Sequence, residues 1–143
     1  MPYGVAQRVR FRCMAEATVL VVDDDAGFRA YVRAALESEQ FRVVEGESGA
    51  DAVEVALRER PDAILLDWRM PGQSGITACR NLRAESMLAG VRIAVITGLD
   101  DERDRTLARH AGADAFFIKD PDPDALTGQV RRLLAADGAS VAP

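Results

Sequence analysis

Residues 18–25 read TVLVVDDD, an apolar run that ends in three aspartates. The run does not alternate between apolar and polar residues, which is typical of a strand buried on both faces of a parallel sheet. Two further runs have the same character, AILLD at residues 63–67 and RIAVIT at residues 92–97. Together they indicate a parallel sheet that is covered by helices on both sides.

Five β-rich runs alternate with helical patterns along the chain. We predict strands at Thr18–Val22, Phe41–Glu45, Ala63–Asp67, Val91–Thr97 and Ala115–Lys119. Between them, apolar residues recur at the helical spacing, and Ser48 and Ser74 are suited to cap the second and third helices. Five βα units in a row predict a flavodoxin-like α/β fold, a five-stranded parallel sheet of order 2-1-3-4-5, doubly wound with five helices.

Composition limits the classes of function. The chain has 143 residues and 48% hydrophobic residues, which fits one domain with a real core. A net charge of −5 argues against a nucleic-acid surface, because phosphate backbones require basic patches. No apolar run reaches the length of a membrane span or of a signal core. We read Cys13 and Cys79 as reduced thiols and expect a cytoplasmic protein without direct nucleic-acid or membrane contact.

The two ends of the chain differ from its centre. Residues 1–15 carry Arg8, Arg10 and Arg12 and are predicted to form an N-terminal extension, more plausibly a loose segment than a basic docking arm. The folded domain is predicted to span residues 16–137, and residues 138–143 to form a C-terminal tail.

In this strand order, ligands bind at the carboxyl ends of the strands, where the order reverses between strands 1 and 3. The residues at those ends are Asp23, Asp24, Asp67, Thr97 and Lys119. Clustered carboxylates repel one another and favour a hard cation such as Mg²⁺, which keeps its waters and meets phosphate. A carboxylate can also accept a phosphoryl group, with the cation and Lys119 supplying charge and Thr97 a hydrogen bond.

Neighbouring polar residues have ordinary structural explanations. Asp25 is interpreted as the cap of the helix that starts near Ala26, Trp68 as packing beside the site, and His110 as a surface or helix-end residue. The end of the second strand, Glu45 to Glu47, is peripheral and is expected to contribute nothing to the site. The functional interpretation depends on the joint placement of the five strand-end residues at one edge.

Four segments stand in order along the chain: VLVVDDDAGFR from residue 19, LLDWRMPGQSG from residue 65, VITG from residue 95 and FFIKDPDPDAL from residue 116. They resemble the receiver domain of two-component response regulators, in its chemotaxis-regulator-like form. The resemblance covers roughly residues 16–136. Each motif is weak by itself, but four in order at the right separations are highly specific.

The resemblance implies a metal and phosphoacceptor site. Asp67 would be the phosphoacceptor, Asp24 would bind Mg²⁺ directly, and Asp23 would help. The backbone carbonyl of Arg69 would complete the metal site. We also hypothesise that the Arg69 side chain screens the carboxylates.

The resemblance further implies a switch. Thr97 and Lys119 would contact the phosphoryl group, and Phe116 occupies the aromatic switch position. Gly98 and Leu99 would flank the site, and we hypothesise that Leu99 hinders attacking water. Family members commonly signal through a face that here would involve residues 100–111 and 116–133.

One position departs from the family pattern. In the family, the lysine at the end of the last strand is usually followed by a proline in a cis peptide. Here Asp120 follows Lys119, and Pro121 comes one position later. A cis bond before a non-proline residue costs ~3–4 kcal/mol. The Lys119–Asp120 peptide is therefore expected to be trans, or cis and strained, which leaves the direction of the Lys119 side chain open.

The resemblance predicts a stand-alone response regulator rather than an enzyme. A sensor histidine kinase or histidine phosphotransfer protein would act upstream and an unknown protein target downstream, on a monomer or a phosphorylation-biased dimer. The alternatives are a phosphorylation-independent interaction module, a fragment of a larger regulator, and an Asp-nucleophile phosphatase. Asp23 and Asp25 have the spacing of such phosphatases, but Ala26-Gly27 follows where they usually have a threonine.

Overall fold

The fold is seen in a computed structural model that describes residues 17–70, 72 and 74–135. The predicted extension at residues 1–15, the tail at residues 138–143 and Cys13 lie outside the described residues, so the domain boundaries stay predictions. Among the described residues, no helix is both long and apolar enough to cross a membrane.

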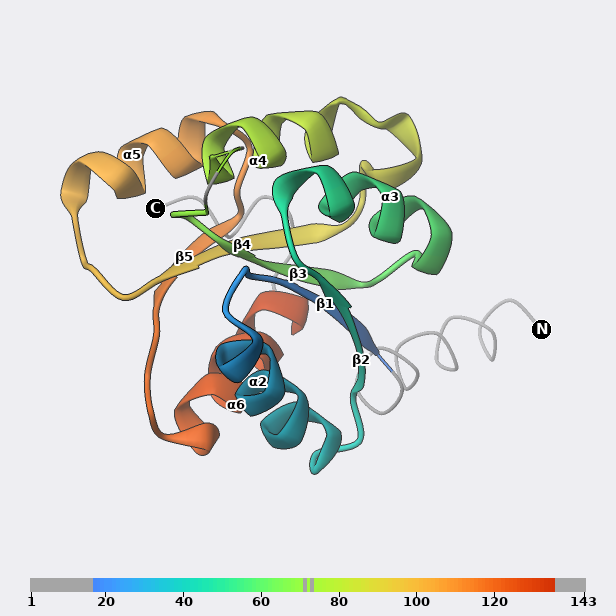
Figure 1. The fold of residues 1–143 in the computed structure, drawn as a ribbon, viewed down its shortest axis with the longest axis vertical. Helices are drawn as coiled ribbons and strands as arrows, with labels where there is room; N and C mark the ends of the chain where they lie inside the picture. Colours follow the sequence, from blue (N-terminus) through green and yellow to red (C-terminus); the bar gives the residue numbers. More distant parts are fainter. Residues whose placement is uncertain (1–16, 71, 73, 136–143) are drawn as a thin grey trace.

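Strands and helices alternate throughout the described chain. The elements are β1 (Thr18–Val22), α2 (Ala26–Glu37), β2 (Arg42–Gly46), α3 (Gly49–Glu59), β3 (Ala63–Asp67), α4 (Gly75–Ala84), the 3-10 turn η1 (Ser86–Leu88), β4 (Arg92–Thr97), α5 (Glu102–His110), β5 (Ala115–Ile118) and α6 (Pro123–Ala135). The strands form one parallel sheet of order β2-β1-β3-β4-β5 (Figure 1). This confirms the predicted flavodoxin-like fold and its strand order.

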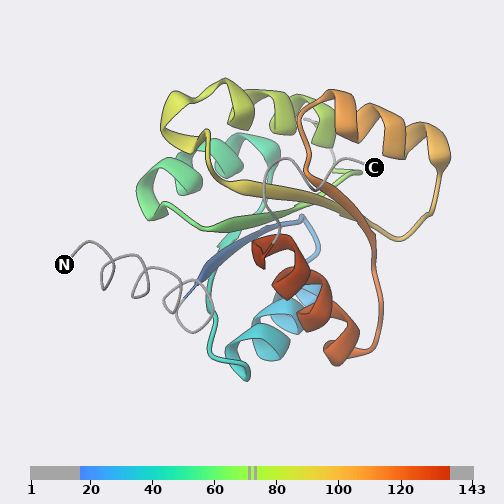
Figure 2. The ribbon, with the colours of Figure 1, turned by 180° about the vertical axis from the view of Figure 1, so that it is seen from behind.

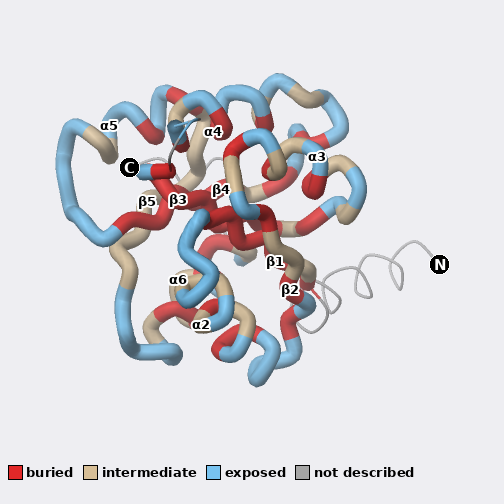
Figure 3. Tube along the Cα trace, viewed as in Figure 1, coloured by how far each residue is buried: buried red, intermediate tan, exposed pale blue. Residues whose placement is uncertain are grey.

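Helices cover both faces of the sheet. Helices α2 and α6 lie on one face and α3, α4 and α5 on the other, as both ribbon views show (Figures 1 and 2). Val19 and Val21 of β1 belong to the apolar cluster under α2 and α6, whereas Leu20 and Val22 belong to the cluster under α3 and α4. Alternate residues of one strand thus enter two cores, which explains why the strand sequence is apolar at every position. The buried centre of the sheet is visible in Figure 3.

Four strand boundaries differ by one residue from the prediction: both ends of β2, which ends at Gly46, the start of β4 and the end of β5. Strand β2 begins at Arg42 because the amide of Phe41 already donates to the carbonyl of Leu36, in the turn after α2. Strand β4 begins at Arg92, after a similar turn in which the amide of Val91 donates to Leu88. Strand β5 ends at Ile118, although the amide of Lys119 still donates to the carbonyl of Thr97 at 2.7 Å.

Side-chain caps fix where three helices begin. The Asp25 carboxylate accepts hydrogen bonds from the amides of Gly27 and Phe28 at the start of α2. Ser48 caps α3 and Ser74 caps α4 in the same way. All three predicted caps are confirmed, and each satisfies amides that the first helical turn leaves without a partner.

The start of α4 lies directly against the end of β3. A Cβ atom at Gly75 would come within 2.8 Å of both the Asp67 carbonyl oxygen and the Trp68 Cα. The Gly75 amide donates to the carbonyl of Trp68 at 3.2 Å. Only a residue without a side chain permits this approach, so Gly75 helps to fix the backbone that carries Asp67.

We predict that Gly75→Ala destabilises the protein by about 1–3 kcal/mol, because the added methyl group must displace backbone atoms. The matched control is Gly90→Ala, where a Cβ atom meets nothing within 4 Å. Urea unfolding of both variants measures the free energies. Equal stabilities for the two variants would show that the close approach at Gly75 is not a constraint.

Candidate functional site

Three carboxylates converge at the carboxyl ends of β1 and β3. One oxygen atom from each of Asp23, Asp24 and Asp67 lies within 4.8 Å of the others. Asp23 and Asp67 are buried, whereas Asp24 is exposed. The strands bring these residues together because β1 and β3 are neighbours in register, with Val22 opposite Leu66. The expected juxtaposition at this edge of the sheet is therefore present.

Lys119 reaches the same cluster from the end of β5. Its Nζ atom lies 2.8 Å from Asp23 Oδ2 and 3.5 Å from Asp67 Oδ1. Burial by itself would lower the pKa of Lys119, but the hydrogen bond to Asp23 and the charges of Asp67 and Asp23 raise it overall. The ammonium group therefore stays charged and partly compensates the carboxylates.

The pKa of the Asp67 carboxyl is raised toward neutral pH. Burial, followed by the charge of Asp23 and, to a smaller extent, that of Asp24, raises its pKa from 3.8 to about 6, against the opposing effect of Lys119. A pKa raised in this way reports a carboxylate that lacks enough positive charge nearby. At neutral pH Asp67 is mostly ionised and is available as a nucleophile or a ligand.

The residues of the cluster fit a magnesium ion. Three carboxylates and one ammonium leave two negative charges uncompensated, which matches a divalent cation. All the side-chain donors are oxygens, and Asp24 is exposed to water. Mg²⁺ favours such sites because it binds through a few carboxylates while keeping several waters.

Thr97 lies at the end of the next strand along. Strand β4 pairs with β3 so that Ile96 is opposite Asp67, which places Thr97 one residue beyond. Thr97 is buried, and its Oγ1 accepts a long hydrogen bond of 3.4 Å from the Leu99 amide. Gly98 and Leu99 follow it and are exposed.

Phe116 of β5 packs beside Ala108 of α5 and Trp68. Its ring is half-buried and lies under the guanidinium group of Arg105, which is 4.8 Å from the ring centroid. The ring lines a hollow of about 140 Å³ together with Ala108 and Ala113. Phe116 is therefore placed where it contacts α5 rather than the acidic cluster.

The side chain of Arg69 does not screen the carboxylates, so this part of the sequence hypothesis is wrong. Its side chain is 60% exposed, and its guanidinium group pairs with Asp104 of α5 at 3.0 Å. The competing carboxylate of Asp104 was not apparent from the sequence, because it is 35 residues away. Trp68 packs against Val95 and Ala108, which agrees with its predicted packing role.

Helix α2 supplies contacts to Lys119 and its loop that the sequence did not predict. The Lys119 Nζ lies 4.2 Å from the centroid of the Phe28 ring, and the Tyr31 hydroxyl donates to the carbonyl of Asp120 at 2.8 Å. All described peptide bonds are trans, including the one that follows Lys119. Two side chains of α2 thus hold the lysine and its loop, one turn apart. The only sequence feature that indicates these contacts is the i, i+3 spacing of Phe28 and Tyr31, which places both rings on one face of α2.

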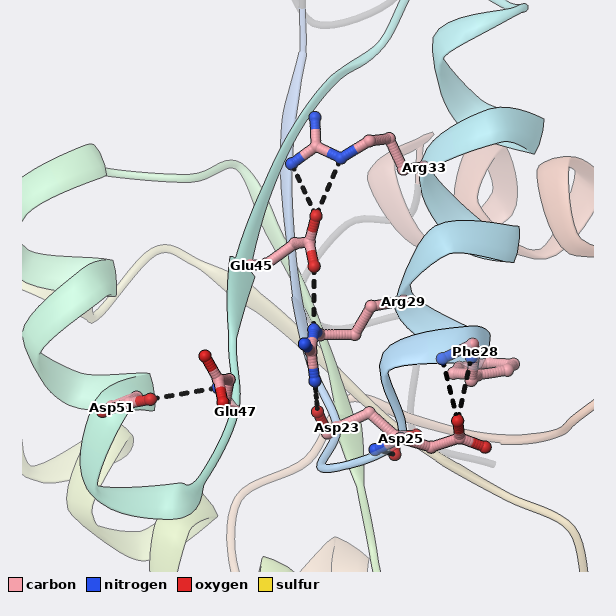
Figure 4. Close-up of polar contacts among 9 residues, drawn as sticks. Asp23, Asp25, Phe28, Arg29, Arg33, Glu45, Glu47 and Asp51 are labelled. Atoms are coloured by element: carbon pink, nitrogen blue, oxygen red, sulfur yellow. Dashed lines mark hydrogen bonds and ion pairs between the residues drawn. The ribbon is translucent and has the colours of Figure 1, made fainter.

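The expectation that the end of β2 contributes nothing is also wrong. Glu45 does not enter the cluster, but it binds Arg29, and Arg29 donates to the backbone carbonyl of Asp23 (Figure 4). Because β2 lies beside β1, its last residues support the loop that carries the first two aspartates.

We predict that Asp67→Asn stabilises the protein at pH 8 in the presence of EDTA, by about 1–2 kcal/mol. Since the pKa of Asp67 is higher in the folded state, the wild type loses stability as the pH rises from about 4 to about 6, and Asn does not titrate. The gain should grow over this window and then stay constant. Urea unfolding at each pH measures it, with Asp120→Asn as a control for net charge; a gain that is already complete at pH 4 would contradict the raised pKa.

A doubly wound sheet with an acidic cluster and a lysine at its switch point defines a class of α/β domains that bind ligands at the carboxyl ends of their strands. Residues 19–131 match the family described as the response regulator receiver domain. The chain belongs to this family, which confirms the resemblance inferred from the four sequence segments.

Relatives of known role support this assignment. The chain is 32% identical over 125 residues to the phosphate regulon transcriptional regulatory protein PhoB of Pseudomonas aeruginosa, and the match covers 87% of the chain and 55% of PhoB. It is 31% identical over 119 residues to protein PilH of the same organism, covering 83% of the chain and 98% of PilH. The chain thus spans about half the length of PhoB and nearly all of PilH.

Solved structures agree with the fold. The chemotaxis protein CheY4 of Vibrio cholerae superposes with a TM-score of 0.80 at 27% identity, over 84% of this chain and 100% of CheY4. The receiver domain of RstA from Klebsiella pneumoniae, solved in a BeF3-activated form, gives a TM-score of 0.75 at 32% identity, over 83% of this chain and 99% of that domain. Receiver domains are signalling switches of two-component systems, typically phosphorylated on aspartate and associated with Mg²⁺.

Proposed function

We propose that this chain is a phosphorylation-dependent switch in which Asp67 accepts a phosphoryl group. The observation that carries the proposal is the position of the Asp67 carboxylate, buried beside two other aspartates and 3.5 Å from the Lys119 ammonium. The donor is the phosphohistidine of a sensor histidine kinase or of a histidine phosphotransfer protein.

In the transfer, a carboxylate oxygen of Asp67 attacks phosphorus. The new P–O bond forms as the P–N bond to the donor histidine breaks, and the imidazole leaves with the electron pair. Lys119 neutralises charge on the phosphoryl oxygens, and the Thr97 hydroxyl donates a hydrogen bond to one of them. Later attack by water on phosphorus releases inorganic phosphate and restores Asp67, without a separate phosphatase.

Mg²⁺ would be held by Asp23, Asp24, Asp67 and the backbone carbonyl of Arg69. When bound, it supplies positive charge to the transferring phosphoryl oxygens. The excess of negative charge in the cluster supports this ligand set. Gly98 and Leu99 flank the phosphoryl position, with Leu99 exposed on the side open to solvent.

The signal leaves through β5 and α5. Thr97 and Phe116 lie on paired strands, and the Lys119 amide donates to the carbonyl of Thr97. Movement of Thr97 toward the phosphoryl group would therefore displace residues of β5. The hollow beside Phe116 supports an inward movement of its ring, which would break the contact with Arg105 and alter α5. A population shift between two such arrangements is sufficient for signalling.

The switch is proposed to act as a stand-alone regulator in the cytoplasm, as a monomer or a phosphorylation-biased dimer, on a downstream protein target. The near-complete match to PilH supports the stand-alone role. Cys79 is a buried free thiol, and burial raises its pKa to about 11, which keeps the thiol protonated and unreactive.

Incubation with acetyl phosphate and Mg²⁺, followed by intact mass, tests the central proposal. We expect a gain of one phosphoryl group that Asp67→Asn abolishes and that EDTA prevents. Binding of beryllofluoride with Mg²⁺ provides a second measurement. No uptake and no beryllofluoride binding by the wild type would favour a phosphorylation-independent interaction module.

The lifetime of the phosphoryl group should depend on Leu99. We predict that Leu99→Ala accelerates loss of the phosphoryl group a few-fold, because the shorter side chain gives water freer access. The loss of phosphoryl mass with time measures the rate. Met87→Ala, which truncates an equally exposed apolar residue in η1, before the opposite end of β4, serves as a control. Identical rates for wild type and Leu99→Ala would remove this role.

A further inference from the structure

Arg29 is a largely buried cation that lies behind the acidic cluster rather than in it. Its side chain is only 12% exposed. Its NH1 group donates to the backbone carbonyl of Asp23 at 2.7 Å, and its Nε donates to Glu45 Oε1 at 2.8 Å (Figure 4). One guanidinium group thus joins the β1–α2 loop to the end of strand β2.

The local structure explains why Arg29 reaches this position. Helix α2 begins at Ala26, so Arg29 lies in its first turn, and its amide makes the first helical hydrogen bond to the carbonyl of Asp25. Side chains in a helix lean toward its N-terminus. The arginine therefore extends back over the loop that precedes the helix.

The carbonyl that Arg29 holds belongs to the peptide group between Asp23 and Asp24. The other polar groups of Asp23 already have partners: its amide donates to Gly46, its Oδ1 accepts from the Asp25 amide at 2.9 Å, and its Oδ2 accepts from Lys119. The contact with Arg29 fixes the remaining one. Rotation of this peptide plane would move both carboxylates, so Arg29 restrains their orientation.

Glu45 gives Arg29 a firm anchor. Burial would raise the pKa of the Glu45 carboxyl, but hydrogen bonds from Arg29 and Arg33 outweigh it and lower the pKa, so the carboxylate stays ionised. The end of β2 is itself held, because the Glu47 amide donates to Asp51 Oδ2 at 3.1 Å. The pairing with Glu45 also offsets the charge of Arg29, which leaves geometry as its main influence on the cluster.

We propose that Arg29 is a positioning residue that sets the affinity of the acidic cluster for Mg²⁺, by fixing the peptide between Asp23 and Asp24. The proposal deepens the proposed function and depends on it. Arg29 would act through Asp23 and Asp24 and would not touch the ion or the phosphoryl group. Such supporting residues commonly change metal affinity 10–100-fold when they are removed.

The test is a Mg²⁺ titration of the full chain, followed by the fluorescence of its single tryptophan, Trp68, and by backbone amide NMR shifts. Arg29→Met removes both hydrogen bonds and should weaken Mg²⁺ binding roughly 10-fold or more. The matched control is Arg33→Met, which removes the other arginine on Glu45 without a contact to Asp23. It should leave the affinity within about twofold of the wild-type value.

Urea unfolding separates positioning from support of the fold. Both variants lose an ion pair with Glu45, so both should unfold at lower urea, whereas only Arg29→Met should bind Mg²⁺ less tightly in the folded state. If Arg29→Met does not fold, Arg29→Lys replaces it, because an ammonium cannot reproduce the two aligned donors. A wild type that binds Mg²⁺, with an Arg29 variant of equal affinity, overturns the inference. A wild type that binds no Mg²⁺ overturns the proposed function itself.

Discussion

Mutual repulsion among three carboxylates is the constraint around which this domain is organised. The oxygens of Asp23, Asp24 and Asp67 are kept within 4.8 Å although two of these residues are buried. Such an arrangement is unfavourable unless nearby groups oppose it. Burial, followed by the charge of Asp23, raises the pKa of Asp67, so Lys119 does not fully offset these two effects. The deficit of positive charge is what makes the pocket receptive to a divalent cation.

The fold supplies the rigidity that this repulsion requires. Strands β1 and β3 are central in the sheet and buried on both faces, so their ends cannot separate without disrupting both cores. The glycine at position 75 allows the start of α4 to lie directly against the strand that carries Asp67. On the other side, α2 braces the loop of Asp23 and the loop of Lys119 through Arg29 and Tyr31. Packing energy thus holds charges that would otherwise move apart.

Sequence reasoning was sufficient wherever the signal was local. Uniformly apolar strands revealed the parallel sheet, the strand order placed the aspartates and Lys119 at one edge, and Ser48 and Ser74 marked helix starts. It was insufficient where a side chain chooses a distant partner. Arg69 binds Asp104, and Glu45 binds Arg29, because helix packing against the sheet brings these residues together. No residue spacing along the chain indicates such contacts. For this reason the sequence does not indicate that the end of β2 supports the site, through Glu45 and Arg29.

The position of Lys119 has a consequence for the resting protein. Its ammonium lies closer to Asp23 than to Asp67, at 2.8 Å against 3.5 Å, with the Phe28 ring beneath it. The lysine thus serves as an internal placeholder counterion. In the proposed switch, a cation held by the aspartates would free the lysine to turn toward the phosphorylated Asp67. Lys119 would then exchange one electrostatic partner for another, with the Phe28 ring beside its ammonium group in the resting protein.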